Sequence, residues 1–117
     1  MRLDVRAYEK NMPFLLQNVD INISKPGANT IFECIGTNTP ILIDAIDGLL
    51  YQESGICNFL EESQIGELFY DVDQLLLKLA QIINNYGHYY KNISSVDNVH
   101  GTAIISKYII KLIKKDK

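Results

Sequence analysis

A Pro-Gly turn that leads into a helix is the part of this chain best suited to hold a ligand. The segment Asp20–Glu33 reads DINISKPGANTIFE: a short apolar strand, the turn Pro26-Gly27, and a helix expected to begin at Thr30 with Glu33 one turn further on. The first N–H groups of a helix have no partner within it, and the peptide dipoles make that end positive. Such a turn suits a phosphate or another anion. The carboxylate of Glu33 is then expected to reach sugar hydroxyls of the same ligand.

The same residues also have a purely structural interpretation. Thr30 and Glu33 form the pattern Thr-x-x-Glu of a capping box, which would exist without any ligand. Pro26 and Gly27 are ordinary turn residues, and Lys25 can be a solvated charge at a strand end. The sequence alone leaves both interpretations open.

Composition narrows the class of protein. The chain has 117 residues, of which 47% are hydrophobic and 21% charged, as expected for one small folded domain spanning residues 1–117. A net charge of −3 argues against a nucleic-acid partner, because such proteins usually carry a basic excess. No apolar run approaches the ~20 residues that span a bilayer, and no signal-peptide pattern is recognised at the start. We therefore expect a cytoplasmic protein.

The cysteines and histidines give no sign of a metal site. Cys34 and Cys57 lie inside apolar helical patterns and are expected to be buried, reduced thiols rather than a disulfide. His88 and His100 have no partners at the spacing of metal ligands, so that surface or core histidines are expected.

Strands and helices are expected to alternate along the chain. Alternating or continuous apolar residues predict four strands, over residues 3–8, 20–24, 40–46 and 66–70. Helical patterns are predicted from Asn11 through Val19 and over residues 30–36, 52–62 and 71–86, with Gly87 as a stop, followed by a short element over 88–93 and a last helix over 98–115. The fold class is therefore α/β: a parallel sheet of about four strands with helices on both faces, Rossmann-like, with C-terminal helices.

Ligands bind such sheets at the carboxyl ends of the strands. Three loops are expected there, namely residues 25–29, residues 47–51 and the loop after Tyr70, and the first two are expected to form a joint site. Asp44 and Asp47 flank the end of the third predicted strand and are interpreted as solvated loop acids.

The motif and its surroundings resemble the C-terminal, donor-binding domain of GT-B glycosyltransferases of family 28. That family includes the lipid-linked GlcNAc transferase of peptidoglycan synthesis and the diacylglycerol sugar transferases. The matching segments are KPGANTIFE at 25–33, TPILI at 39–43, Gln52-Glu53 with Asn58, the helix lead-in MPFLL at 12–16, and IGELFY at 65–70.

The resemblance implies a nucleotide-sugar site, with no metal and no cofactor besides the UDP-sugar donor substrate. The implied contacts are Gly27, Ala28, Asn29 and Thr30 with the diphosphate, Glu33 with the ribose hydroxyls, and Gln52 and Glu53 with the donor sugar. Gln52 and Glu53 are equally well explained as exposed residues in the first turn of a helix. No catalytic residue is assigned.

The chain departs from the family in what it lacks. Family members begin this domain with two further strand-helix units, and a separate N-terminal domain binds the acceptor and usually supplies the catalytic base. Transfer requires donor and acceptor to be positioned across a cleft. We therefore expect the chain to be inactive alone and to need an N-terminal GT-B domain or a separate acceptor-binding subunit. Two alternatives remain: a fragment of a sugar-nucleotide epimerase, and a non-catalytic α/β interaction domain in which Thr30 and Glu33 only cap a helix.

The last predicted helix is amphipathic. Its apolar stripe comprises Ile104, Ile105, Tyr108, Ile109, Leu112 and Ile113, and its other side carries Lys107, Lys111, Lys114 and Lys115. A basic amphipathic helix can dock on an anionic membrane surface, here the inner face of the membrane, or on a partner. The alternative is a terminal helix packed on its own sheet with solvated lysines.

Overall fold

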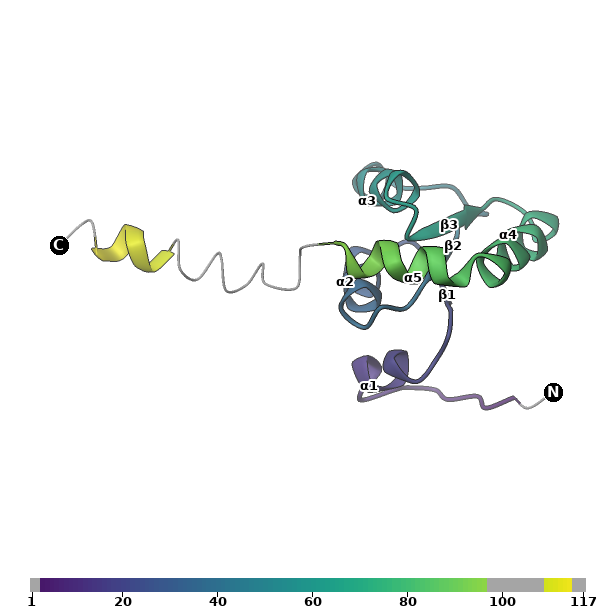
Figure 1. The fold of residues 1–117 in the computed structure, drawn as a ribbon, viewed down its shortest axis with the longest axis horizontal. Helices are drawn as coiled ribbons and strands as arrows, with labels where there is room; N and C mark the ends of the chain where they lie inside the picture. The colour runs from purple at the N-terminus through teal and green to yellow at the C-terminus, as the bar shows by residue number, and fades with distance from the viewer. Residues whose placement is uncertain (1–2, 97–108, 115–117) are drawn as a thin grey trace.

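The computed structural model describes residues 3–96 and 109–114 and has an α/β fold (Figure 1). The elements, in chain order, are α1 (Met12–Gln17), β1 (Asn22–Ser24), α2 (Ala28–Gly36), β2 (Ile41–Asp44), α3 (Tyr51–Glu62), β3 (Gly66–Phe69), α4 (Val72–Asn84) and α5 (Tyr86–Ser94). Residues 109–114 are also helical. The predicted helix over 98–115, together with His100, otherwise lies outside the described residues.

The described strands form one parallel sheet in the order β1-β2-β3. β2 lies in the centre, and its residues Ile41, Leu42 and Ile43 are completely buried. An unbroken apolar run is typical of a parallel strand whose two faces are both covered. The prediction of a buried central strand is confirmed, with bounds a residue or two shorter than expected.

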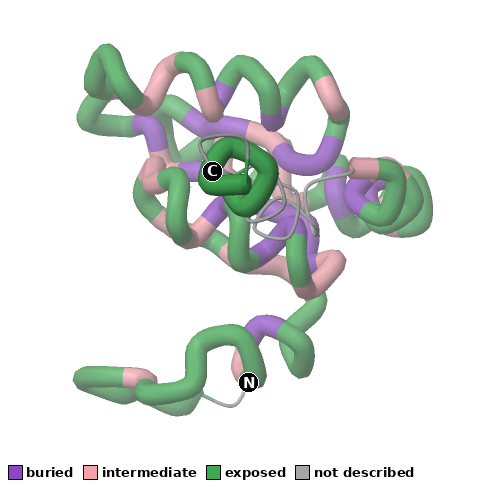
Figure 2. The backbone as a smooth tube through the Cα atoms, turned by 90° about the vertical axis from the view of Figure 1, so that its left-hand side faces the viewer, coloured by how far each residue is buried: buried purple, intermediate pink, exposed green. Residues whose placement is uncertain are grey.

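Helices pack on both faces of this sheet. Ile41 and Ile43 point toward α2 and α3, whereas Leu42 points toward α4. Right-handed crossovers explain why the two helices that link neighbouring strands share one face. Figure 1 shows α2 and α3 on one side of the strands and α4 on the other, and Figure 2 shows the buried backbone gathered in the middle of the body. Cys34 and Cys57 are free and fully buried, as predicted.

Helix α5 closes the amino edge of the sheet. Its side chains bond the loop that leads into each strand: Tyr86 Oη donates to Asp20 O (3.0 Å), Ser94 Oγ to Asn38 Oδ1 (3.2 Å), and Asn92 Nδ2 to Gln64 O (3.0 Å). Because α5 occupies the amino ends of the strands, the opposite, carboxyl edge is the one left open to a ligand.

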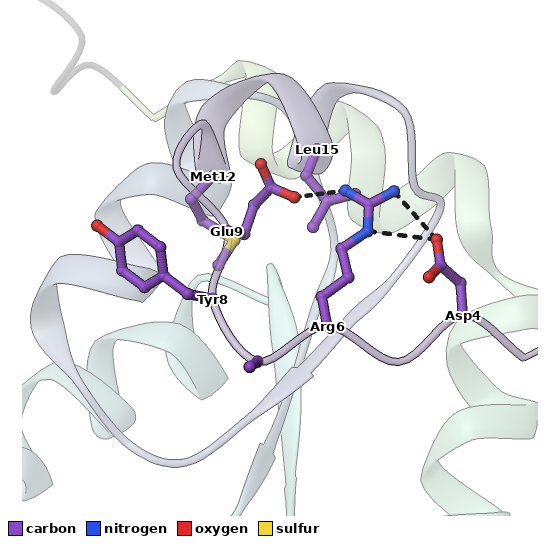
Figure 3. A pocket seen from close by; sticks show the side chains of 7 residues that line it. Asp4, Arg6, Tyr8, Glu9, Met12 and Leu15 are labelled. Carbon is purple, nitrogen blue, oxygen red and sulfur yellow. Dashed lines mark hydrogen bonds and ion pairs between the residues drawn. The ribbon is translucent and has the colours of Figure 1, made fainter.

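The strand predicted over residues 3–8 is wrong. This segment has no regular secondary structure and pairs with no strand of the described sheet. Leu3 and Val5 are about 80% and 81% exposed, so the apolar alternation buries nothing. Arg6 is instead held by the neighbouring carboxylates of Asp4 and Glu9, as Figure 3 shows. The described sheet therefore has three strands, not four.

Two helix boundaries also differ from prediction. α2 begins at Ala28, not Thr30, because Gly27 is extended (φ −168°, ψ 127°) and is the residue at which the helix starts. The capping-box interpretation of Thr30 is thus wrong, since Thr30 is already the third helical residue. Gly87 does not end a helix either: the chain turns at Asn85, which closes α4 and opens α5.

Candidate functional site

The loops after β1 and β2 meet at the open edge of the sheet. Lys25, just after β1, places its Nζ 3.0 Å from Asp44 Oδ2 at the end of β2 and 3.2 Å from Asp47 Oδ2 in the next loop. Lys25 and Asp47 are 63% and 86% exposed, as expected of solvated charges, whereas Asp44 is 24% exposed. The expectation that the two loops adjoin is confirmed, and the ion pairs between them are an additional feature that the sequence does not indicate. Exposed ion pairs add little stability. Their effect here is to hold the two loops together.

The ion pair of Lys25 and Asp44 shifts the pKa values of both side chains. A hydrogen bond to Asp44, followed by one to Asp47, raises the pKa of Lys25. The pKa of Asp44 is lowered, first by the backbone N–H of Ile46 and then by Lys25. These shifts favour the ionised forms of Lys25 and Asp44, and the cluster contains one acidic side chain more than it contains basic ones.

The N-terminus of α2 lies in the first of these loops and has no side-chain cap. Its first helical bond runs from Ile31 N to Gly27 O (3.1 Å), and no side chain accepts from the N–H groups that precede it. Two other helices have a side-chain cap: Phe14 N donates to Asn11 Oδ1 in α1, and Gln74 N donates to Asp71 Oδ1 in α4. In α3, Glu53 Oε1 accepts from the N–H of Leu50, the residue before the helix, and no side chain caps the N–H groups of the first turn. Like α3, α2 therefore presents its terminal N–H groups and positive dipole end without a side-chain acceptor.

Polar side chains continue from this helix end along one side of α2. Asn29 and Glu33 are four residues apart and therefore share a face, separated by about 6 Å along the axis. Both are exposed, and Thr30 between them is half-buried. A single ligand that carries an anionic group and, about one helical turn away, hydroxyl groups can thus contact both the helix end and Glu33.

The residues expected to contact the donor sugar are placed differently. Gln52 is exposed in the first turn of α3. Glu53 is half-buried, and its Oε1 accepts from Leu50 N at 2.9 Å, so this carboxylate is bonded to the backbone just before α3. Within the described residues, no hydrogen bond joins either side chain to α2. The ion pairs of Lys25 bring the two loops together without adding Gln52 or Glu53 to a hydrogen-bonded joint site.

Sequence reasoning missed a polar cluster at the amino edge. Glu67 of β3 accepts through Oε1 from Tyr89 Oη (2.7 Å) and from Gln81 Nε2 (2.8 Å), and its Oε2 lies 3.3 Å from Lys78 Nζ. Burial, and then the hydrogen bond to Glu67, raises the pKa of Tyr89 to about 12, so the phenol remains a donor. The only signal in the sequence is a glutamate inside an apolar strand. The cluster fastens β3, α4 and α5 together.

Next to this cluster is a polar pocket of about 290 Å³ that includes His88. His88 Nε2 is bonded to Gln64 Oε1 at 2.7 Å. Across residues 3–96 and 109–114, no buried side-chain polar atom lacks a partner, and no three His, Cys, Asp or Glu side chains are grouped as metal ligands. We regard this pocket as structural, because its polar groups satisfy one another.

Comparison with protein-family models, with curated proteins and with solved structures finds no match to this chain. None of the described helices combines the length and apolar character needed to cross a membrane.

Proposed function

We propose that the N-terminus of α2 binds the diphosphate of a UDP-sugar, and that the chain is the donor-binding part of a glycosyltransferase. The acceptor proposed for the transferred hexose or N-acetylhexosamine is lipid-linked or similar. The observation that carries the proposal is the uncapped start of α2 after Gly27, at the open carboxyl edge of a parallel sheet. Phosphate groups are the usual ligands of such helix ends.

Glu33 extends the proposal from an anion to a nucleotide. Its carboxylate lies one helical turn from the diphosphate position, on the same face as Asn29. A carboxylate has two acceptor oxygens, which match the two vicinal hydroxyls of a ribose. Glu53 is not part of the proposed sugar contact, because its carboxylate is bonded to the backbone N–H of Leu50, and Gln52 is the remaining candidate.

In the proposed reaction, an acceptor hydroxyl attacks the anomeric carbon of the sugar. The bond from that carbon to the diphosphate oxygen breaks, the hydroxyl proton goes to a base outside this chain, and UDP leaves. The N-terminus of α2 stabilises the charge that grows on the departing diphosphate. Holding the acceptor is assigned to an N-terminal GT-B domain or a separate subunit, since one side of a cleft positions only one reactant.

The acidic residues beside the helix limit the affinity expected of the isolated chain. The cluster of Lys25, Asp44 and Asp47 has an excess negative charge at the same edge. A diphosphate must therefore bind against some repulsion, which is screened by salt. We expect the affinity for UDP to be modest, in the millimolar range or somewhat better, and to rise as salt is added rather than fall.

The ribose contact is tested by changing the ligand and the protein separately and then together. The dissociation constants of UDP and 2′-deoxy-UDP are measured by NMR titration for the full chain and for Glu33→Ala. Loss of the 2′-hydroxyl should weaken binding to the wild type several-fold and leave binding to Glu33→Ala unchanged, because the hydroxyl has then lost its partner. Equal effects of the deoxy substitution in both proteins would contradict the role of Glu33.

A second candidate function, a non-catalytic interaction domain, is favoured by one observation. Several large apolar side chains of α4 are exposed, among them Leu76 (64%) and Leu77 (70%). Apolar helix surface of this kind usually packs against something. What covers it can be inferred independently of the nucleotide site.

A further inference from the structure

Helix α4 has a wider apolar face than the sheet covers. Ile82 is fully buried against the sheet, but Val72, Leu76 and Ile83 are 63%, 64% and 58% exposed. Positions 72, 76 and 83 are separated by four and seven residues, so they form one line along the helix. The line lies beside the buried side of α4, not opposite to it, and therefore borders the sheet.

The neighbouring part of the sheet is also uncovered. Ile23 of β1 is paired with Leu42 of β2 and shares its face, yet Ile23 is 49% exposed whereas Leu42 is buried. Strands lie about 4.8 Å apart and packed helices about 8–10 Å apart, so one helix covers about two strands. α4 follows β3 and covers the β3 side of this face. Room for one further helix remains over β1.

A cleft marks this position. It is lined by Asp20, Ile21, Ile83 and Tyr86, which come from the segment leading into β1, from α4 and from α5. We call the surface formed by Ile21, Ile23, Leu76, Ile83 and Tyr86 the α4–β1 groove. Its floor is apolar, and an acidic side chain stands at its end.

The described residues also contain one helix whose apolar side is uncovered. In the helix of residues 109–114 every side chain is exposed, and the apolar ones are Ile109 (49%), Ile110 (50%), Leu112 (47%) and Ile113 (56%). Lys111 and Lys114 lie on the opposite side of the helix, as the 3.6-residue period requires. This helix therefore has an apolar face that can cover the apolar floor of the groove, and lysines on its other side.

Charge and reach both favour docking within one chain. Residues 3–96 contain 12 acidic and 5 basic side chains, a net charge of −7, whereas residues 97–117 contain 5 lysines and 2 aspartates, a net charge of +3. The 12 residues between 96 and 109 can span at most about 40 Å, and a body of this length is about 30 Å across. We infer that the helix of residues 109–114 docks into the α4–β1 groove of its own chain, with its apolar side on the groove floor.

A spin label at position 111, on the side of the helix opposite to its apolar face, tests this placement in the full chain without nucleotide. In Lys111→Cys the new thiol is the one that reacts, because Cys34 and Cys57 are fully buried. The amide signals of Ile23 and Ile83 should lose most of their intensity when the label is oxidised. The amide signal of Phe59, on α3 at the other face of the sheet, should not.

Matched variants separate docking from mere proximity. Ile109→Asp with Ile113→Asp, added to the labelled chain, should restore the signals of the groove residues, because it places carboxylates on the apolar side. Lys114→Ala, on the opposite side of the same helix, should leave the signal losses in place. Restoration of the signals by both changes, or by neither, would overturn the inference.

Other occupants give distinguishable results, and each would overturn the proposal. If the helix docked on a second copy, signal losses would also appear in a mixed sample. In that sample one population of the chain carries the isotope and no spin label, and the other carries the spin label and no isotope. A membrane surface would leave the groove signals unchanged in solution, while the label became immobilised on vesicles containing anionic lipid. Losses that do not depend on protein concentration, and that are absent from the mixed sample, are the expected result.

Discussion

Replacing Gly27 by aspartate should weaken ligand binding at the start of α2 and stabilise the helix. The glycine has an extended backbone that any residue adopts, and a Cβ added there would meet nothing within 4 Å. An aspartate can therefore occupy the position without strain. Its carboxylate would accept from the uncapped N–H groups of α2, in the place proposed for the diphosphate.

The expected sizes of the two effects follow from the same geometry. A carboxylate in place of glycine as the N-cap gains roughly 0.5 kcal/mol, which raises Tm by about 3 °C in a domain of this size. A carboxylate about 4 Å from a phosphate repels it by about 1 kcal/mol in water and by about 4 kcal/mol at an effective dielectric constant of 20. Together with the loss of the N–H donors, this should weaken UDP binding about tenfold or more.

Calorimetric titration with UDP and thermal unfolding measure the two effects on the same samples. Gly27→Ala is the steric control: it adds the Cβ without a cap or a charge, so binding should stay within a few-fold of wild type. Gly27→Asn caps without a charge and should fall between the two. Undiminished UDP binding by Gly27→Asp would refute the placement of the diphosphate at α2, and a lower Tm would refute the uncapped helix start.

Three further predictions concern the body of the fold. Gly66→Ala should cost about 3 kcal/mol in denaturant unfolding, because the new Cβ would lie 2.2 Å from the backbone oxygen of Ile41; a cost below about 1 kcal/mol would show that the strands separate easily. Gly55→Ala, inside α3 with open space around its Cβ, should gain about 0.5–1 kcal/mol, and a loss in the same assay would contradict the open space. Above pH 9 the free energy of unfolding should fall, by up to about 1.4 kcal/mol per pH unit, because burial raises the pKa of Cys34 to about 12 and the unfolded thiol loses its proton first. The raised pKa of Tyr89 adds to this above pH 10, and urea midpoints that stay constant from pH 8 to pH 11 would contradict both.

Local patterns predicted the elements that are defined by their own residues. The run Ile41–Ile43 identified the central strand because only a strand covered on both faces tolerates unbroken branched apolar residues. The amphipathic period of α4 was equally clear, although its outer apolar residues proved exposed. The segment over residues 3–8 has the same kind of local pattern and still forms no strand, because a strand needs a neighbour and the described sheet offers it none.

The start of α2 shows how a local pattern can mislead. Thr30 and Glu33 satisfy the capping box, but Gly27 can adopt the extended backbone of a helix start earlier in the chain. The helix therefore begins at Ala28 and places Thr30 inside it. The result is an uncapped helix end, which the capping-box interpretation would have excluded.

Contacts between distant residues were beyond the reach of the sequence. Lys25 and Asp47 are 22 positions apart, and nothing local indicates that they form an ion pair. Two further contacts depend on where α5 crosses the sheet. They are the hydrogen bond of Tyr89 to Glu67 and the bond from Tyr86 to the loop before β1. That crossing is set by the packing of the whole domain.

The central claim, a diphosphate site at the start of α2, is tested most directly by amide NMR of the full chain titrated with UDP. Saturable shifts that are largest at Ala28, Asn29 and Thr30, extend to Glu33, and vanish in Gly27→Asp are the predicted result. An absence of shifts up to millimolar UDP, or shifts centred on the amino edge around Glu67, would contradict it.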